Sequence, residues 1–149
     1  RSLVDVVEHA RRKTLTRRER SLLEQLRSSQ PSAWQVRAVR PGDEGPRARL
    51  VDLLDAAAPP VEVPVGPGVT EGYLFLARLL ELDGVLCPAP GSVPLPPQLA
   101  AVLAPRLRQR FSELRSADPD SPWPVIRKRH SAELYREAIA VLQEQLEKL

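Results

Sequence analysis

The apolar positions of the chain are densest in one stretch, residues 70–84, which leaves almost no polar face. A helix that is apolar on nearly all sides is either buried by its neighbours or lies in a membrane. This run is far shorter than the ~20 residues that a membrane-spanning helix needs. Thr70 is a suitable N-cap, and Asp83-Gly84 provides a natural helix end. The pattern therefore predicts a buried central helix over residues 70–83.

Apolar residues also recur at helical spacing in several other segments. These further predicted helices cover residues 2–13, 16–28, 47–58, 97–116 and 124–149. Thr16 and Glu19 have the spacing of a capping box at the start of the second of these helices. Pro105 lies inside the helix over 97–116, so we expect either a kink there or two helices that meet at Ala104.

Two segments alternate between apolar and polar residues instead. The alternation over residues 33–40 is weak and favours a short strand over another helical turn. Valines alternate with Glu62 and Pro64 over residues 61–65, which predicts an extended edge segment. We therefore predict an all-α, or nearly all-α, single domain over residues 1–149. It would be a compact bundle of about six helices around the buried central helix, with Pro-rich connectors and at most two short extended segments.

Composition narrows the functional classes only a little. The formal net charge of +3 is compatible with nucleic-acid binding but is too small to argue for it. The single cysteine, Cys87, excludes an internal disulfide and suits the cytoplasm or another reducing intracellular compartment. No apolar signal region or membrane-spanning stretch is found, so no membrane partner is expected. The start at Arg1 rather than Met allows the chain to be a fragment of a larger protein.

Basic residues gather in two places that could bind nucleic acid. The first surrounds the junction of the first two predicted helices and comprises Arg11, Arg12, Lys13, Arg17, Arg18 and Arg20. The second lies early in the last predicted helix and comprises Arg127, Lys128 and Arg129. Either cluster could contact phosphates. The simpler interpretation is a solvated charged surface, with Asp118, Asp120 and Glu133 as local partners of the second cluster.

Residues 15–26, LTRRERSLLEQL, resemble the opening helix of helix-turn-helix regulators. A recognition helix should follow within a few residues in that family. Residues 28–46 instead contain Pro31, Pro41, Gly42, Gly45 and Pro46. We therefore do not assign the chain to the family.

The sequence offers little for catalysis or metal binding. His130, Glu133 and Glu137 share one helix face, but the di-iron pattern is Glu-x-x-His on two helices, and here the order is reversed. Cys87 is better explained as a small buried apolar residue than as a nucleophile. No P-loop, G-x-G-x-x-G or G-x-S-x-G motif is present. We therefore expect no catalytic, cofactor-binding or metal-binding residues, no cofactor, and a protein that is not an enzyme.

Aromatic and leucine side chains supply a candidate interface instead. Its members are Trp34 and Trp123, placed in connectors, and Tyr135, Leu142, Leu146 and Leu149 on the last predicted helix. The leucines have two interpretations. They could pack on the domain's own core, for example against Leu3 and Val7, which we favour, or they could face another chain.

The leading functional prediction is a non-catalytic helical protein–protein interaction or assembly module. Its partner would be another protein or a further domain of the same protein. The alternative is a nucleic-acid-binding domain that uses the Arg-rich junction over residues 11–20. A helical enzyme assembled from residues distant in the sequence comes third.

Overall fold

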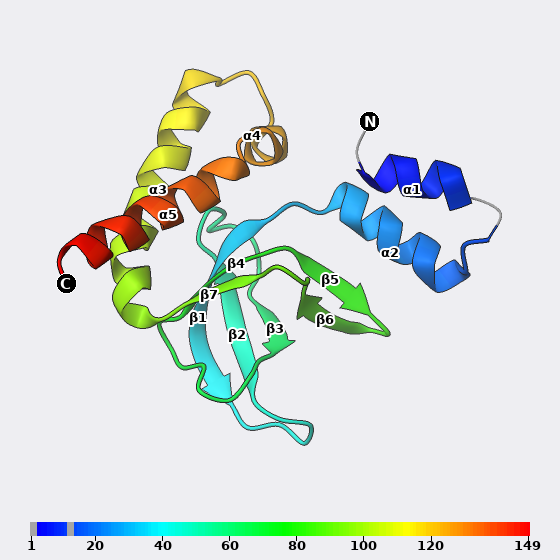
Figure 1. The fold of residues 1–149 in the computed structure, drawn as a ribbon, viewed down its shortest axis with the longest axis horizontal. Helices are drawn as coiled ribbons and strands as arrows, with labels where there is room; N and C mark the ends of the chain where they lie inside the picture. The colour runs from blue at the N-terminus through cyan, green and yellow to red at the C-terminus, as the bar shows by residue number, and fades with distance from the viewer. Residues whose placement is uncertain (1–2, 12–13) are drawn as a thin grey trace.

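The structure is a computed structural model that describes residues 3–11 and 14–149. These residues form five helices and seven strands (Figure 1). The helices are α1 (Leu3–Arg11), α2 (Arg17–Ser28), α3 (Pro97–Ala117), α4 (Trp123–Arg129) and α5 (Ala132–Glu147). The strands are β1 (Ser32–Arg40), β2 (Arg47–Asp52), β3 (Val61–Pro64), β4 (Leu74–Ala77), β5 (Leu79–Leu82), β6 (Val85–Pro88) and β7 (Val93–Leu95).

The fold is therefore mixed α/β, and the prediction of an all-α helical bundle is wrong. All strands pair antiparallel. Five of them form one sheet in the order β3-β2-β1-β4-β7, and β5 pairs with β6 in a separate two-stranded sheet. The extended segments predicted over residues 33–40 and 61–65 are confirmed as β1 and β3.

The predicted central helix over residues 70–83 is instead the two consecutive strands β4 and β5. Leu74 and Leu76 belong to a cluster that includes residues of α3 and α5, whereas Phe75 and Ala77 belong to a cluster with β1, β2 and β3. A strand covered on both faces reads as a continuous apolar run. Periodicity alone cannot distinguish such a short apolar run from a buried helix. This explains why a helix was predicted over residues 70–83.

The helix predicted over residues 47–58 is also wrong, because its first half is strand β2. Ala48, Leu50 and Asp52 are buried, whereas Arg47, Arg49 and Val51 between them are more exposed. That is the period of two expected of a strand. The strand pairs with β1, with Val36 opposite Leu50, and the register shifts between Val36 and Ala38.

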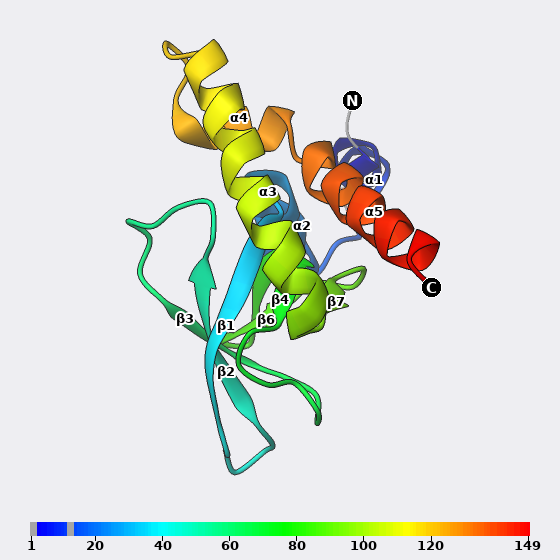
Figure 2. The ribbon, with the colours of Figure 1, turned by 90° about the vertical axis from the view of Figure 1, so that its left-hand side faces the viewer.

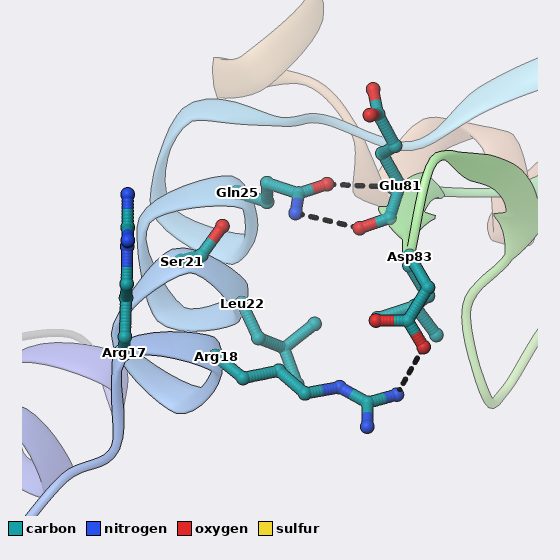
Figure 3. Close-up of a pocket in the computed structure, with 8 residues that line it drawn as sticks. Arg17, Arg18, Ser21, Leu22, Gln25, Glu81 and Asp83 are labelled. Atoms are coloured by element: carbon teal, nitrogen blue, oxygen red, sulfur yellow. Dashed lines mark hydrogen bonds and ion pairs between the residues drawn. The ribbon is translucent and has the colours of Figure 1, made fainter.

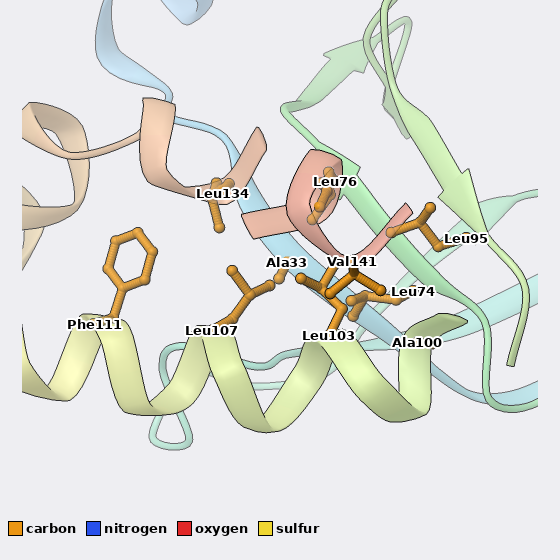
Figure 4. Close-up of a cluster of buried hydrophobic side chains, with 11 residues drawn as sticks. Ala33, Leu74, Leu76, Leu95, Ala100, Leu103, Leu107, Phe111, Leu134 and Val141 are labelled. Carbon is orange, nitrogen blue, oxygen red and sulfur yellow. The ribbon is translucent and has the colours of Figure 1, made fainter. Parts of the chain in front are cut away.

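Helices α3 and α5 pack on one face of the five-stranded sheet (Figure 2). Four side chains on one side of α3 point toward the apolar residues of the sheet and of α5 (Figure 4). They are Ala100, Leu103, Leu107 and Phe111. On the other face, the β5–β6 hairpin contacts β3, and Leu79 and Leu86 pack against the second apolar cluster.

The predicted helix over residues 97–116 is confirmed as α3, which runs without a break through Pro105. Two helices meeting at Ala104 are therefore excluded. The helix predicted over residues 124–149 is divided into α4 and α5, because His130 and Ser131 interrupt it. We call α3, α4 and α5 the helical layer.

Helices α1 and α2 form an arm that lies to one side of the sheet (Figure 1). The predicted capping box is confirmed: the Thr16 side chain accepts a hydrogen bond from the Glu19 backbone, and the Glu19 side chain accepts one from the Thr16 backbone. No residue of α2, all of which the structure describes, is fully buried. The most extensive contact between the arm and the rest of the molecule is that of α2 with β5.

A buried ion pair joins α4 to the strands. The Arg127 guanidinium donates to the Asp52 carboxylate and to the Ser32 hydroxyl, both at 2.7 Å. The Ser32 hydroxyl in turn donates to Asp52 at 2.6 Å, and the Leu54 backbone N–H donates to the same carboxylate. Asp52, Arg127 and Ser32 are all buried. Buried charges are tolerated when they are paired and hydrogen-bonded, which explains a charged residue at the end of β2.

Candidate functional site

Helix α5 has two apolar rows, and the other residues that the structure describes cover only one of them. Leu134 and Val141 are buried against the sheet and α3 (Figure 4). Ala138 belongs to the same buried cluster. The second row lies about 100° around the helix, at 3.6 residues per turn. It consists of Ile139, Leu142 and Leu146, together with Leu149 just beyond the helix end, and these residues are 54, 37, 66 and 101% exposed. We call these four residues the uncovered stripe.

The favoured interpretation of Leu146 and Leu149, packing on the domain's own core, is therefore wrong. Leu134, Ala138 and Val141 are the side chains of α5 that pack into the main apolar core. The proposed internal partners Leu3 and Val7 belong to the arm, which Figure 1 shows away from the C-terminal end of α5. The apolar face of this helix is wider than the surface available to cover it.

The spacing of the uncovered stripe alternates between three and four residues. This is the pattern with which one helix packs along another. Tyr135 extends the stripe toward the start of α5, but it is half-buried and packs against the main core. Arg136, Gln143 and Glu147 border the stripe on its solvent side, and all three are exposed. Of these surface residues, sequence reasoning missed Ile139 as an interface residue, although its spacing from Tyr135 and Leu142 could have identified it.

Two ion pairs fix α5 against α3. Both Glu144 carboxylate oxygens accept hydrogen bonds from the Arg106 guanidinium, one of them at 2.9 Å. The hydrogen bond with Arg106 lowers the pKa of Glu144, and the same bond raises the pKa of Arg106. Burial raises the pKa of Glu133, but hydrogen bonds from Arg110 and Arg136 outweigh burial, and the net effect is a lowered pKa. The stripe is thus carried by a helix that is held firmly on its other sides.

The two candidate tryptophans lie in regular elements and not in connectors. Trp34 is in β1, and its indole N–H donates to the Ala77 carbonyl at 3.1 Å. Trp123 opens α4 and donates to the Leu54 carbonyl at the same distance, with its ring edge-on to Phe111. Both side chains are half-buried. Each ties separate segments of the fold together.

The first basic cluster is only partly visible. Arg12 and Lys13 lie outside the described residues, as does the side chain of Arg11. Arg17, Arg18 and Arg20 are exposed on the first turns of α2. A groove of about 370 Å³ separates these turns from β5 (Figure 3).

This groove is not lined by one sign of charge. Arg18 reaches across it to Asp83, with 2.8 Å between guanidinium and carboxylate (Figure 3). Further along α2, the Gln25 amide makes two hydrogen bonds to the backbone of Glu81. A neighbouring strand would make the same pair of hydrogen bonds. The Gln25 side chain therefore supplies partners for the backbone N–H and C=O of Glu81 at the open edge of β5. The groove therefore joins the arm to β5 through mixed polar contacts.

The second basic cluster is spread over three environments. Arg127 is buried in the ion pair with Asp52. Arg129 is paired with Asp118 at 2.9 Å, and hydrogen bonds from Ser121 and Arg129 lower the pKa of Asp118. Lys128 is exposed and contacts the Arg27 carbonyl near the end of α2, about 15 Å of helix away from Arg17. The described residues of the two clusters do not merge into one basic surface.

The remaining candidate chemistry is sparse. Among residues 3–11 and 14–149, no three His, Cys, Asp or Glu side chains are grouped as a metal site. The Cys87 thiol is half-buried and lies 3.5 Å from the Leu80 carbonyl. Within the described part of the chain, no helix combines the length and the apolarity needed to cross a membrane.

The uncovered stripe contains four of the eight large apolar side chains that are exposed in the described part of the chain. No protein-family model, curated protein or solved structure matches the chain, so similarity assigns it neither a family nor a function.

Proposed function

We propose that the chain is a non-catalytic protein–protein interaction or assembly module, which binds its partner through the uncovered stripe of α5. The observation that carries the proposal is the exposure of Ile139, Leu142 and Leu146 on a helix whose neighbouring apolar row is buried in the core. Contiguous exposed apolar side chains bordered by polar residues are typical of interaction surfaces.

The energetics support docking at this surface. Full burial of a leucine or isoleucine side chain contributes about 1.5–3 kcal/mol. Helix α5 is already ordered by Leu134, Val141 and the Arg106–Glu144 pair. A partner would therefore gain the apolar burial without the cost of ordering this helix.

A double substitution tests the proposal. Leu142→Glu/Leu146→Glu places two charges on the uncovered stripe, where their solvation in the free chain costs little. We expect its thermal melting to match that of the parent chain, and its capture of protein partners from native extract to be lost. The matched control is Val125→Glu, which changes an exposed apolar residue of α4 away from the stripe and should leave capture unchanged.

The readout is quantitative mass spectrometry of the captured proteins, with further copies of this chain counted among them. A nuclease-treated sample separates protein partners from those bridged by nucleic acid. Identical capture by the parent chain and the double variant would exclude the stripe as the docking surface.

A further inference from the structure

We infer that the partner at the uncovered stripe is a second copy of this chain, with the two α5 helices antiparallel about a two-fold axis at Leu142. This inference rests on the proposed function and names its partner. The stripe reads almost the same in both directions from Leu142: Ile139 and Leu146 lie next on either side, and Tyr135 and Leu149 lie beyond them. An antiparallel pair would place Leu142 against its own copy, Ile139 against Leu146, and Tyr135 against Leu149.

Such a surface is self-complementary. In a two-fold interface the same patch serves both subunits, so each contact between different residues occurs twice. An apolar row that is symmetric about one residue meets this condition without a second surface. A different partner would have no need of the symmetry.

Charged residues beside the stripe favour the same arrangement. Arg136 and Glu147 border the stripe on the same side and near its opposite ends. The Arg136 side chain is 72% exposed, and its contact with Glu133 is within one turn of its own helix. Antiparallel pairing brings Arg136 of each copy next to Glu147 of the other, on the flank shared by both helices. Parallel two-fold pairing would instead place this side of the two stripes on opposite flanks of the helix pair, where Arg136 and Glu147 would not meet.

Pairing of two copies through the β7 edge of the five-stranded sheet is disfavoured by Pro94 in that strand. In β1, the backbone of Val36 bonds toward β4, at Gly72 and Tyr73. The backbone N–H and C=O of Trp34, two residues earlier in the same strand, also point toward β4, where Trp34 lies opposite Phe75. The backbone of Phe75 therefore points toward β1, so Pro94, its partner in β7, points its nitrogen away from the sheet. Proline has no N–H to offer an added strand, so the outer edge of β7 is blunted.

The size of the surface sets the expected strength. A stable complex usually buries about 800 Å² on each partner, and one short helix offers less than this. We therefore expect a reversible dimer whose population depends on concentration in the micromolar to millimolar range. The two Arg136–Glu147 contacts would set the direction of pairing more than its strength.

The test is sedimentation equilibrium of the purified full chain over that concentration range. The parent chain should dimerise, and Leu142→Glu/Leu146→Glu should stay monomeric with unchanged helicity. Arg136→Glu and Glu147→Arg should each raise the dimer dissociation constant by about tenfold, since each creates two like-charge contacts. Combining them in Arg136→Glu/Glu147→Arg restores opposite charges across the axis and should return the constant to within about twofold of the parent value.

The possible results are distinct. A parent chain that remains monomeric, but still captures another protein through the stripe, overturns the second-copy inference and leaves the proposed function standing. A dimer that survives in Leu142→Glu/Leu146→Glu also overturns the inference, because it uses another surface. Dimers that the combined charge exchange fails to restore overturn the antiparallel arrangement. Loss of both dimerisation and capture in the parent chain removes the proposed function as well.

Discussion

The arm and the helical layer are both amphipathic, yet they are attached to the molecule in different ways. Helix α3 buries Leu103, Leu107 and Phe111 against the sheet. Helix α2 has a comparable row, Leu22, Leu23 and Leu26, but each of these is only half-buried. An apolar row on a helix therefore does not by itself show how completely it is covered.

Polar contacts hold the arm where apolar packing is thin. Gln25 bonds the backbone of Glu81, Arg18 pairs with Asp83, and the Arg78 guanidinium donates to the Leu26 carbonyl at 2.6 Å. Such contacts between exposed groups contribute little net stability each. Regions with few buried apolar contacts open at lower free energy than the core. We therefore expect the arm to detach from the molecule before the helical layer does.

The largest expected effect is at the buried ion pair, which ties the helical layer to the sheet. Asp52→Ala leaves the Arg127 charge, the Ser32 hydroxyl and the Leu54 N–H without their carboxylate. We expect a loss of about 3–5 kcal/mol, the usual result of breaking a buried pair from one side. Chemical denaturation monitored by circular dichroism measures this loss.

A matched control is Asp55→Ala, because Asp55 lies 3.9 Å from the other guanidinium nitrogen of Arg127 and is partly exposed. It should cost much less. Replacement of both partners, in Asp52→Leu/Arg127→Met, should recover most of the loss if packing is kept. An Asp52→Ala chain as stable as the parent would show that α4 is not fastened here.

The next largest effect is the difference in stability loss when a leucine is changed to alanine in the helical layer and in the arm. Leu107→Ala in α3 should cost about 2–5 kcal/mol, because a fully buried leucine is removed from the core. Leu23→Ala in α2 removes a half-buried leucine and should cost less than half as much. Denaturant titrations of both variants measure the difference. Equal losses would mean that the arm is as well packed as the helical layer, and the comparison would fail.

The smallest expected effect is a dependence on pH in the helical layer. The hydrogen bond with Arg106 lowers the pKa of Glu144 below the ordinary value of 4.5. A carboxyl group whose pKa is lower in the folded state stabilises that state above its unfolded pKa and loses the effect as the pH falls through its folded pKa. We therefore expect the melting temperature to fall below about pH 4.5.

Glu144→Gln should reduce that fall slightly and should lower the melting temperature a little at neutral pH. Melting curves of the parent chain and the variant, recorded across this range, provide the comparison. Gln143→Glu, at an exposed neighbouring position, is a control for added charge on the same helix. Parallel pH profiles for the parent chain and Glu144→Gln would show that the pair with Arg106 does not contribute.

Sequence reasoning succeeded where local chemistry decides the structure. The Thr16–Glu19 capping box, the strand over residues 33–40 and the long helix after Pro97 all depend on neighbouring residues. It failed at β4 and β5, because covering both faces of a strand removes the alternation that would have identified it. It also failed over residues 47–58, which were predicted to be helical. Asp52 instead ends a strand and pairs with Arg127, which is distant in the sequence.

For the candidate interface too, local features could be predicted from the sequence, whereas burial and distant partners could not. The spacing of Leu142, Leu146 and Leu149 was visible in the sequence. It correctly placed Leu142 and Leu146 on one row of a helix, whereas Leu149 lies just beyond the helix end. Whether that row is covered depends on the position of α5 over the sheet, which Leu134, Ala138 and Val141 determine together with α3. The roles of Arg127 and Trp123 depend on Asp52 and Leu54, and no local pattern connects these pairs.

The hydrogen bonds between Gln25 and Glu81 have a consequence for measurement. The backbone N–H of Glu81 donates to a side-chain oxygen of the arm at 2.6 Å and not to another strand. Its protection from exchange with solvent deuterium therefore reports the docking of α2, while the neighbouring amides that bond within the β5–β6 hairpin report the hairpin itself. In Gln25→Ala, exchange at Glu81 should become fast while those neighbouring amides remain slow. A single backbone amide thus serves as a gauge of the arm's attachment.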